Sequence, residues 1–139
     1  MKLLCFQAKR FRWKTHSKTL PQVADLDIQA EVRQTVVIFI HAETSDAEEV
    51  RTSSVLRQSL KHIKWLANKR ELKNIVLHSF THLGGATAEP AFAASFIATL
   101  SQRLSDTGYK VSTTPFGYFC EWDLEVFGDS LAKVWKEIR

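Results

Sequence analysis

The pattern of hydrophobic and polar positions along the chain predicts a series of strands and helices. The clearest strand covers residues 35–42, a continuous β-branched run that is typical of a strand buried on both faces. Residues 75–80 form a shorter run of the same kind. At the start, residues 2–6 are apolar and residues 7–16 alternate, which predicts two paired strands. We expect residues 17–33, which are polar and irregular, to form a loop.

Helical spacing of apolar residues predicts two long helices between the strands. The first covers residues 45–70, with Ser45 as its N-cap and acidic residues in the first turn. The second covers residues 90–104 and begins at Pro90, because proline fits the first turn of a helix. A further strand is predicted at 109–113, after the second helix.

The C-terminal part of the chain predicts one long strand and one short helix. Residues 118–127 alternate as a strand, and residues 131–138 carry apolar residues at helical spacing. Strands and helices interleave, and no linker, repeat or low-complexity tract separates them. The pattern therefore predicts a single domain, residues 1–139, of the α/β (α+β) class.

Composition narrows the class of protein. The 139 residues are 45% hydrophobic and 24% charged, as in a soluble domain with one core. No apolar run approaches the ~20 residues that cross a bilayer, so we expect no membrane association. Two cysteines cannot form a disulfide framework, and the start of the chain is too short an apolar stretch for a signal peptide. We therefore expect a reducing, cytoplasmic setting.

The charge is mildly basic, with a formal net value of +4. Two groups of cations supply much of the excess, Lys9, Arg10, Arg12, Lys14 and Lys18 in the first and Lys61, Lys64, Lys69, Arg70 and Lys73 in the second. Phe11, Trp13 and Trp65 lie beside them, an arrangement that suits phosphate contacts together with base stacking. A solvated charged surface explains the same pattern, so both interpretations stay open.

Histidines at the ends of buried strands are the main candidates for a site, because ligands of sheet proteins gather there. His41 and His82 each stand where an apolar strand runs out. Gly84 and Gly85 follow, and glycines let the backbone approach a ligand. His78 lies inside its strand, so we expect a hydrogen-bonded core histidine there.

Common cofactor and nucleophile motifs are absent from the sequence. It contains no His-x-x-x-His pair on a predicted helix, and no P-loop lysine motif, Gly-x-Gly-x-x-Gly or Gly-x-Ser-x-Gly. We therefore expect no metal and no organic cofactor. Cys120 lies on the apolar face of the 118–127 strand, where a buried thiol is the usual outcome, and Glu121 points to the opposite face.

Two separated motifs resemble one known family. Residues 80–90, Phe-Thr-His-Leu-Gly-Gly-x-x-x-x-Pro, resemble the Phe-Ala-His-Leu-Ser-Ser-x-x-x-x-Pro segment of the archaeal-type editing domain of threonyl-tRNA synthetase. Residues 114–120, Thr-Pro-Phe-Gly-Tyr-Phe-Cys, are similar to that family's Ala-Pro-Phe-Gly-Tyr-Tyr-Lys. Residues 1–4 and 36–40 also line up, so the resemblance spans nearly the whole chain. It predicts a free-standing relative of the editing domain.

The resemblance implies a fold, a partner and a reaction. The family is similar to D-aminoacyl-tRNA deacylases, with a barrel-like mixed sheet flanked by helices, and it forms homodimers. Its members hydrolyse the ester that joins serine to the 3′ end of threonine tRNA. We therefore expect this chain to cleave a mischarged, seryl-type aminoacyl ester in trans. A catalytically inactive RNA-binding or interaction module on the same fold, and a D-aminoacyl-tRNA deacylase, are the alternatives.

The resemblance also implies site residues. Catalytic roles are expected for His82, Tyr118 and Cys120, which stand at matching positions of the two motifs. Substrate-binding roles are expected for Ala42, His41, Gly84, Gly85, Phe116, Gly117 and Glu121.

The second motif departs from the family at two positions. Phe119 replaces the second tyrosine, and Cys120 stands where the family has its functional lysine. Cysteine cannot supply the charge or the donors of lysine. Activity could persist through backbone groups and the ribose hydroxyl, with help from Glu121 or Lys110. Cys120 could instead act as a thiolate, which needs a nearby cation, or the deacylation could be lost.

Overall fold

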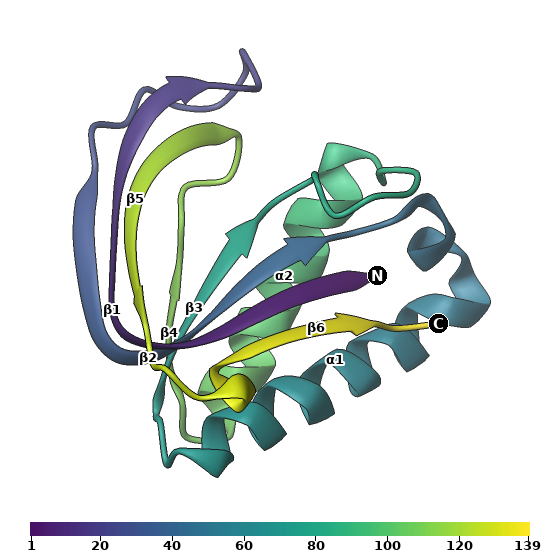
Figure 1. Cartoon of the computed structure of the whole chain (residues 1–139). Helices are drawn as coiled ribbons and strands as arrows, with labels where there is room; N and C mark the ends of the chain where they lie inside the picture. Colours follow the sequence, from purple (N-terminus) through teal and green to yellow (C-terminus); the bar gives the residue numbers. More distant parts are fainter.

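The computed structural model, which describes residues 1–139, is built around one long strand, β1 (Lys2–Lys18). One edge of β1 pairs antiparallel with β2 (Gln29–His41) along most of its length. The other edge pairs with β6 (Lys133–Glu137) through its first part and with β5 (Tyr118–Val126) through the rest (Figure 1). The two predicted strands are therefore one continuous strand, and the predicted loop at 17–33 is confined to residues 19–28.

A sharp bend explains the apparent break between the two predicted strands. β1 has a bulge between Ala8 and Arg10 relative to β5, and in β2 Gln34 has a φ of +52° (Figure 1). A bulge adds one residue, so the alternation of side chains changes face at that point. Phe11 and Trp13 consequently lie with Ala8 on one face of the sheet. The sequence pattern changes where the strand bends, not where it ends.

The remaining strands and the helices follow in βαβ order. β3 (Asn74–Ser79) is parallel to β2, and β4 (Lys110–Thr113) is parallel to β3. α1 (Glu49–Lys69) joins β2 to β3 after a short 3-10 turn, and α2 (Pro90–Asp106) joins β3 to β4. These elements lie within a few residues of the prediction, except that the segment 44–47 is not part of α1.

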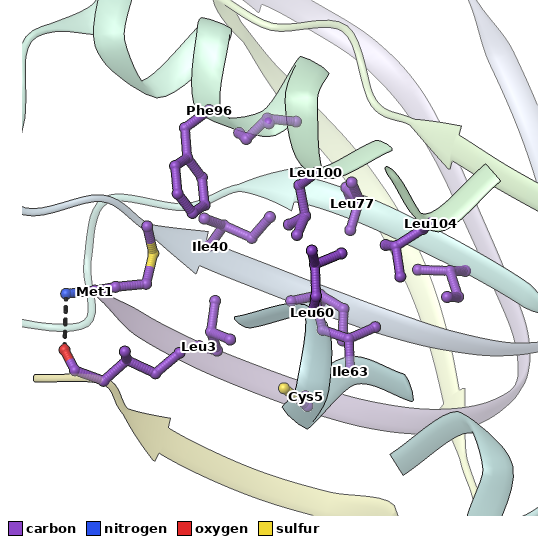
Figure 2. Close-up of a cluster of buried hydrophobic side chains, with 14 of the residues drawn as sticks. Met1, Leu3, Cys5, Ile40, Leu60, Ile63, Leu77, Phe96, Leu100 and Leu104 are labelled. Carbon is purple, nitrogen blue, oxygen red and sulfur yellow. Dashed lines mark hydrogen bonds between the residues drawn. The ribbon is translucent and has the colours of Figure 1, made fainter. Parts of the chain in front are cut away.

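The two faces of the sheet carry separate cores. The larger one lies between the sheet and both helices, where Leu3 and Ile40 meet Leu60 and Phe96 (Figure 2). The smaller core lies on the other face, where it contains aromatic residues such as Phe39 and no residue of either helix. Burial of a large apolar side chain contributes about 1.5–3 kcal/mol, so both clusters stabilise the bent sheet.

The predicted helix at residues 131–138 is wrong. A short 3-10 turn, Ser130–Ala132, leads into β6, which pairs with the first part of β1. Val134 and Ile138 have a separation that suits either a helix or a strand, and both still reach the helix-covered core. Eight residues form a marginal helix, whereas pairing with β1 satisfies the backbone groups of both strands.

The complete sheet has the order β4-β3-β2-β1-β5, with β6 also on β1. It curls strongly but is open, since β4 and β5 lie at opposite ends of this order. Neither helix has both the length and the apolar character that crossing a membrane requires.

Candidate active site

A cavity of about 530 Å³ lies at the carboxyl ends of β2 and β3, beside the first turn of α2. Its wall is formed by Thr19 and Leu20 just after β1, by residues 78–82, by Thr87, Ala88 and Pro90, and by the segment 114–120 that leads into β5. Ligands of α/β sheets bind at such strand ends, and this volume is typical of small-molecule sites. The geometry therefore provides one partly open site for a small ligand or for the end of a longer one.

The cavity brings together residues of both sequence motifs. The predicted site residues on its wall are His82, Tyr118, Cys120, Ala42, Phe116 and Gly117. The predicted residues His41, Gly84, Gly85 and Glu121 are not on the wall. Residues 82 and 118 are far apart in sequence, and the parallel order of β2, β3 and β4 places their segments at the same end of the sheet.

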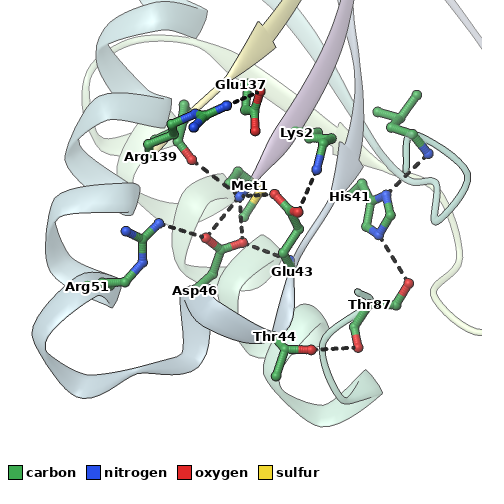
Figure 3. A network of polar contacts seen from close by, with 12 residues as sticks. Met1, Lys2, His41, Glu43, Thr44, Asp46, Arg51, Thr87, Glu137 and Arg139 are labelled. Atoms are coloured by element: carbon green, nitrogen blue, oxygen red, sulfur yellow. Dashed lines mark hydrogen bonds and ion pairs between the residues drawn. The ribbon is translucent and has the colours of Figure 1, made fainter. Parts of the chain in front are cut away.

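His41 holds the loop that carries His82. Its Nδ1 accepts a hydrogen bond of 3.2 Å from the Leu83 amide, so the neutral ring carries its proton on Nε2. Nε2 then donates to Thr87 Oγ1 at 3.1 Å (Figure 3). Burial lowers the pKa of His41, which favours this neutral form. Thr87 lines the cavity, and its own hydroxyl proton is left for another acceptor.

Gly85 lies against a buried ionic network rather than the cavity. The Met1 ammonium donates to Glu43 Oε1 at 2.7 Å and to Asp46 Oδ1 at 2.9 Å, and Lys2 binds the other oxygen of Glu43 at 2.5 Å (Figure 3). A Cβ on Gly85 would lie 2.5 Å from Glu43 Oε2 and 2.8 Å from Lys2 Nζ. The positive φ of +84° and this close contact both favour glycine here, which the sequence could not distinguish from close approach of a ligand.

Glu121 and Lys110 do not reach the cavity. Glu121 binds Arg12 at 3.0 Å on the exposed face of β5, as the alternation of the strand predicted. Lys110 is exposed at the start of β4. Neither residue is placed to assist a reaction at the cavity.

The hydroxyl of Tyr118 is engaged outside the cavity. It donates to the carbonyl of Ala24 and accepts a 2.9 Å hydrogen bond from the amide of Leu26. The neighbouring Gly117, with a φ of +85°, accepts at its carbonyl from the amide of Thr19 at 2.7 Å. The hydroxyl of Tyr118 thus fixes the loop after β1 beside the cavity, and it is not free for a substrate.

His78 and Thr114 form a polar pair on the cavity wall that sequence analysis did not assign to the site. His78 Nδ1 and Thr114 Oγ1 lie 2.8 Å apart, and both side chains are buried. Burial lowers the pKa of His78 to about 4, so the ring is neutral near pH 7. The expected hydrogen-bonded core histidine is confirmed, but it also borders the cavity. The sequence feature that could have indicated this position is the alternation of residues 78, 80 and 82, which places His78 on the same side of the segment as His82.

Cys120 is half-buried beside the apolar core formed by Phe39 and its neighbours. Burial raises the pKa of its thiol. The cavity wall contains no lysine, arginine, aspartate or glutamate, so no fixed cation stabilises a thiolate. The polar groups that remain are hydroxyls, backbone groups and the imidazoles of His78 and His82. His82 is exposed at the cavity, where its ring meets Phe80 edge-on at 5.2 Å.

The family model and the similar sequences agree on one family. Residues 1–138 match the family model described as the archaea-specific editing domain of threonyl-tRNA synthetase. The chain is similar to threonine–tRNA ligases, with 29% identity over 140 residues to that of Hyperthermus butylicus and 28% over 143 residues to that of Staphylothermus marinus. These matches cover 96% and 100% of the chain, but the chain spans only 22% of each ligase.

A solved structure, the c-Myc DNA unwinding element binding protein, has a similar fold. The TM-score is 0.70 over 100% of this chain and 99% of that chain, with 13% sequence identity. At this identity the likeness shows the fold alone. It confirms the expected fold class, a mixed sheet flanked by helices. Since the family model matches almost every residue, the chain belongs to the family of the archaea-specific editing domain of threonyl-tRNA synthetase.

Proposed function

We propose that this chain edits aminoacyl-tRNA by hydrolysing, in trans, a mischarged seryl-type ester at the tRNA 3′ end. Membership of the editing-domain family supports a role in tRNA editing. The observation that carries the proposal is the cavity itself, because it joins the His82 motif and the Tyr118–Cys120 motif at one set of strand ends. No cofactor is part of the proposal.

Editing of this kind corrects a weak discrimination. A pocket built for threonine rejects serine poorly, since one methyl group changes binding by only about 1–3 kcal/mol. Cleavage of the ester then requires an oriented water, donors for the tetrahedral oxyanion and a proton for the ribose leaving group. A neutral cavity with several hydroxyls suits an ester and a ribose better than it suits a phosphate.

The residues that line this cavity have separate roles in the proposal. Ala42, Phe116 and Gly117 bound the space for the terminal adenosine, and His82 lies beside the aminoacyl group at the open side. Because no charged side chain lines the wall, backbone amides and the substrate's ribose hydroxyl supply most of the catalysis. The first turn of α2 adds the partial positive charge of a helix N-terminus near Pro90.

A homodimer is part of the proposal, and an exposed apolar face supports it. Trp135 pairs with Leu4 across β6 and β1, which places it on the sheet face that no helix covers. Trp135 is 52% exposed, and Leu4 and Phe6 beside it are only half-buried. Light scattering of the protein and of Trp135→Glu tests this part, since the variant should be monomeric.

The decisive experiment measures release of serine from seryl-tRNA specific for threonine. The purified protein should accelerate this release, and His82→Ala should reduce the rate by about 10²-fold, the usual range for one acid–base or orienting group. His16→Ala, which changes an exposed histidine on β1, is the control. A rate equal to that in buffer, with the protein folded, would remove the proposal.

One observation favours a second candidate, an inactive module that binds aminoacyl ends. Cys120 occupies the position of the family's lysine, and nothing charged replaces it in the cavity. This candidate predicts tRNA binding without turnover, and binding that survives His82→Ala. A D-aminoacyl-tRNA deacylase would instead show a preference for the D-enantiomer of the same ester.

A further inference from the structure

We infer that the exposed side of α1 is a second RNA-binding surface, which holds a phosphate backbone away from the cavity. This surface, the α1 basic face, consists of Arg57, Lys61, Lys64 and Trp65 of α1 with Lys136 of β6. The inference rests on the proposed function in one respect only, that the RNA is tRNA.

The two arginines of the first basic group are paired with acidic side chains in the fold. Arg10 binds Glu31 at 3.0 Å, and Arg12 binds Asp123 at 2.7 Å and Glu121 at 3.0 Å. The aromatic residues next to these arginines, Phe11 and Trp13, are buried in the smaller core. The β1 strand therefore offers neither free arginines nor stacking rings.

Lys61 and Lys64 of the second group remain unpaired on α1, together with Arg57. The chain has no aspartate or glutamate between Glu49 and Glu71, so no acid lies one turn away from Arg57, Lys61 or Lys64. None of these three cations forms an ion pair, whereas Arg51 and Arg70 on the same helix do.

The spacing makes these charges neighbours. Arg57, Lys61 and Lys64 are separated by four and three residues, which places them side by side on the helix surface. Like charges at this spacing destabilise a helix by a few tenths of a kcal/mol per pair. The apolar stripe that includes Ile63 and Leu66 already anchors the opposite side of α1, so packing does not require the cations.

Trp65 adds a stacking surface among these cations. It is 43% exposed, and its ring lies 5.6 Å from that of His62 with the planes tilted by 31°. Lys136 lies close enough to His62 to lower its pKa, after the larger effect of burial, so β6 extends the positive surface beyond α1. Exposed cations around an exposed indole match the chemistry of an RNA strand, namely phosphates with bases that can stack.

The α1 basic face and the cavity occupy different parts of the molecule. α1 lies along the helix-covered side of the sheet, beside β6 (Figure 1). No residue of α1 lines the cavity, which lies at the carboxyl end of β3 and the N-terminus of α2. A short aminoacyl-nucleoside bound in the cavity cannot reach α1, but a tRNA extends far enough to contact both. Substrates of these two lengths therefore distinguish the two sites in an experiment.

The test compares Lys61→Gln/Lys64→Gln with the matched double variant Lys14→Gln/Arg103→Gln, whose cations are exposed and unpaired on β1 and α2. Binding of unacylated tRNA is measured as a function of salt. We expect the α1 variant to bind about tenfold more weakly at low salt and the slope of log K against log salt to fall by about one per lysine. Trp65→Ala should weaken binding with little change in slope.

Hydrolysis provides the second readout. Seryl-tRNA should lose about tenfold in kcat/KM in the α1 variant, whereas seryl-adenosine, which is too short to reach α1, should be cleaved at the wild-type rate. Equal tRNA affinity in both double variants overturns the inference, and it would point to an acidic protein as the partner of this face. If the wild-type protein cleaves neither substrate, the proposed function fails, but the binding measurement still decides the inference. Circular dichroism confirms that each variant is folded.

Discussion

His78 and Thr114, which lie 36 residues apart in the chain, share a 2.8 Å hydrogen bond at the wall of the cavity. The bond joins the end of β3 to the segment that follows β4. Because both side chains are buried, the imidazole cannot exchange this partner for bulk water. The pair therefore fixes the geometry of the cavity and makes its stability depend on pH.

Acidification should destabilise the protein through His78. Burial lowers its pKa in the folded state to about 4, whereas an unfolded chain has a value near 6.5. Between these values the unfolded chain binds the proton and the folded chain does not, so the stabilisation is complete above pH 6.5 and is lost as the pH falls to 4. Because one pKa unit corresponds to about 1.4 kcal/mol, we expect the free energy of unfolding to fall by about 3 kcal/mol over this pH range.

Urea unfolding between pH 7.5 and 4 measures this loss. His78→Asn should flatten the dependence, and His16→Asn, an exposed histidine, should not. Burial also lowers the pKa values of His41 and His62, so the variant retains a smaller slope of the same sign. An identical slope in His78→Asn and the wild type would contradict the assignment.

Local patterns in the sequence predicted the middle of the chain well and the ends poorly. Residues 75–80 form a largely apolar run that stops a few residues before two glycines, and both the strand and its end were predicted to within one residue. The prediction for the start of the chain was wrong because the change of alternation at the bulge between Ala8 and Arg10 has the same local pattern as the end of one strand and the start of another. β6 was missed for a related reason, since it forms only because the first part of β1 has a free edge.

The two adjacent glycines should differ in their tolerance to alanine. Gly84 and Gly85 have φ values of +98° and +84°, so each alanine carries a backbone cost of about 1–3 kcal/mol. At Gly84 nothing lies within 4 Å of the added Cβ, but at Gly85 the Cβ meets Glu43 and Lys2. These groups are held by each other and by the Met1 ammonium, so they cannot move away freely.

Gly85→Ala should therefore reduce the free energy of unfolding by about 1–2 kcal/mol more than Gly84→Ala, the range for overpacking a fixed site. Chemical denaturation of the two variants gives the difference directly. Equal losses would mean that the Lys2–Glu43 pair is free to rearrange in solution.

Loss of the His41 side chain should loosen the loop that carries His82. His41→Ala leaves the Leu83 amide without its acceptor and Thr87 without its donor, and each lost hydrogen bond costs about 0.5–1.5 kcal/mol because water reaches both groups. Hydrogen exchange at the Leu83 amide should become faster. His62→Ala removes a half-buried histidine whose Nε2 has no partner, so it should leave this amide unchanged. Slow exchange at Leu83 in His41→Ala would show that other contacts hold the loop.

The site was predictable where sequence motifs coincide with strand ends and less so elsewhere. His82 and Ala42 follow strands, and the fold places both at the cavity. Gly85 and His41 lie close by but serve the loop, because a motif marks a segment and does not say which way each side chain points. The position of His78 inside its strand predicts a core histidine, and the structure has it buried and hydrogen-bonded, but a position in the sequence does not show that the same side chain borders the cavity.

Restoring the family residue should raise the rate of seryl-ester cleavage. Cys120 lines the cavity, so Cys120→Lys introduces a cation and its donors where the family has them, and no carboxylate on the wall neutralises it. We expect at least a tenfold gain in kcat/KM for seryl-tRNA, the effect of a charged donor worth about 1.4 kcal/mol in the transition state. Cys120→Met, which is long but uncharged, controls for filling the cavity. If both variants lose activity equally, added volume blocks the substrate, and the groups already present carry out the reaction.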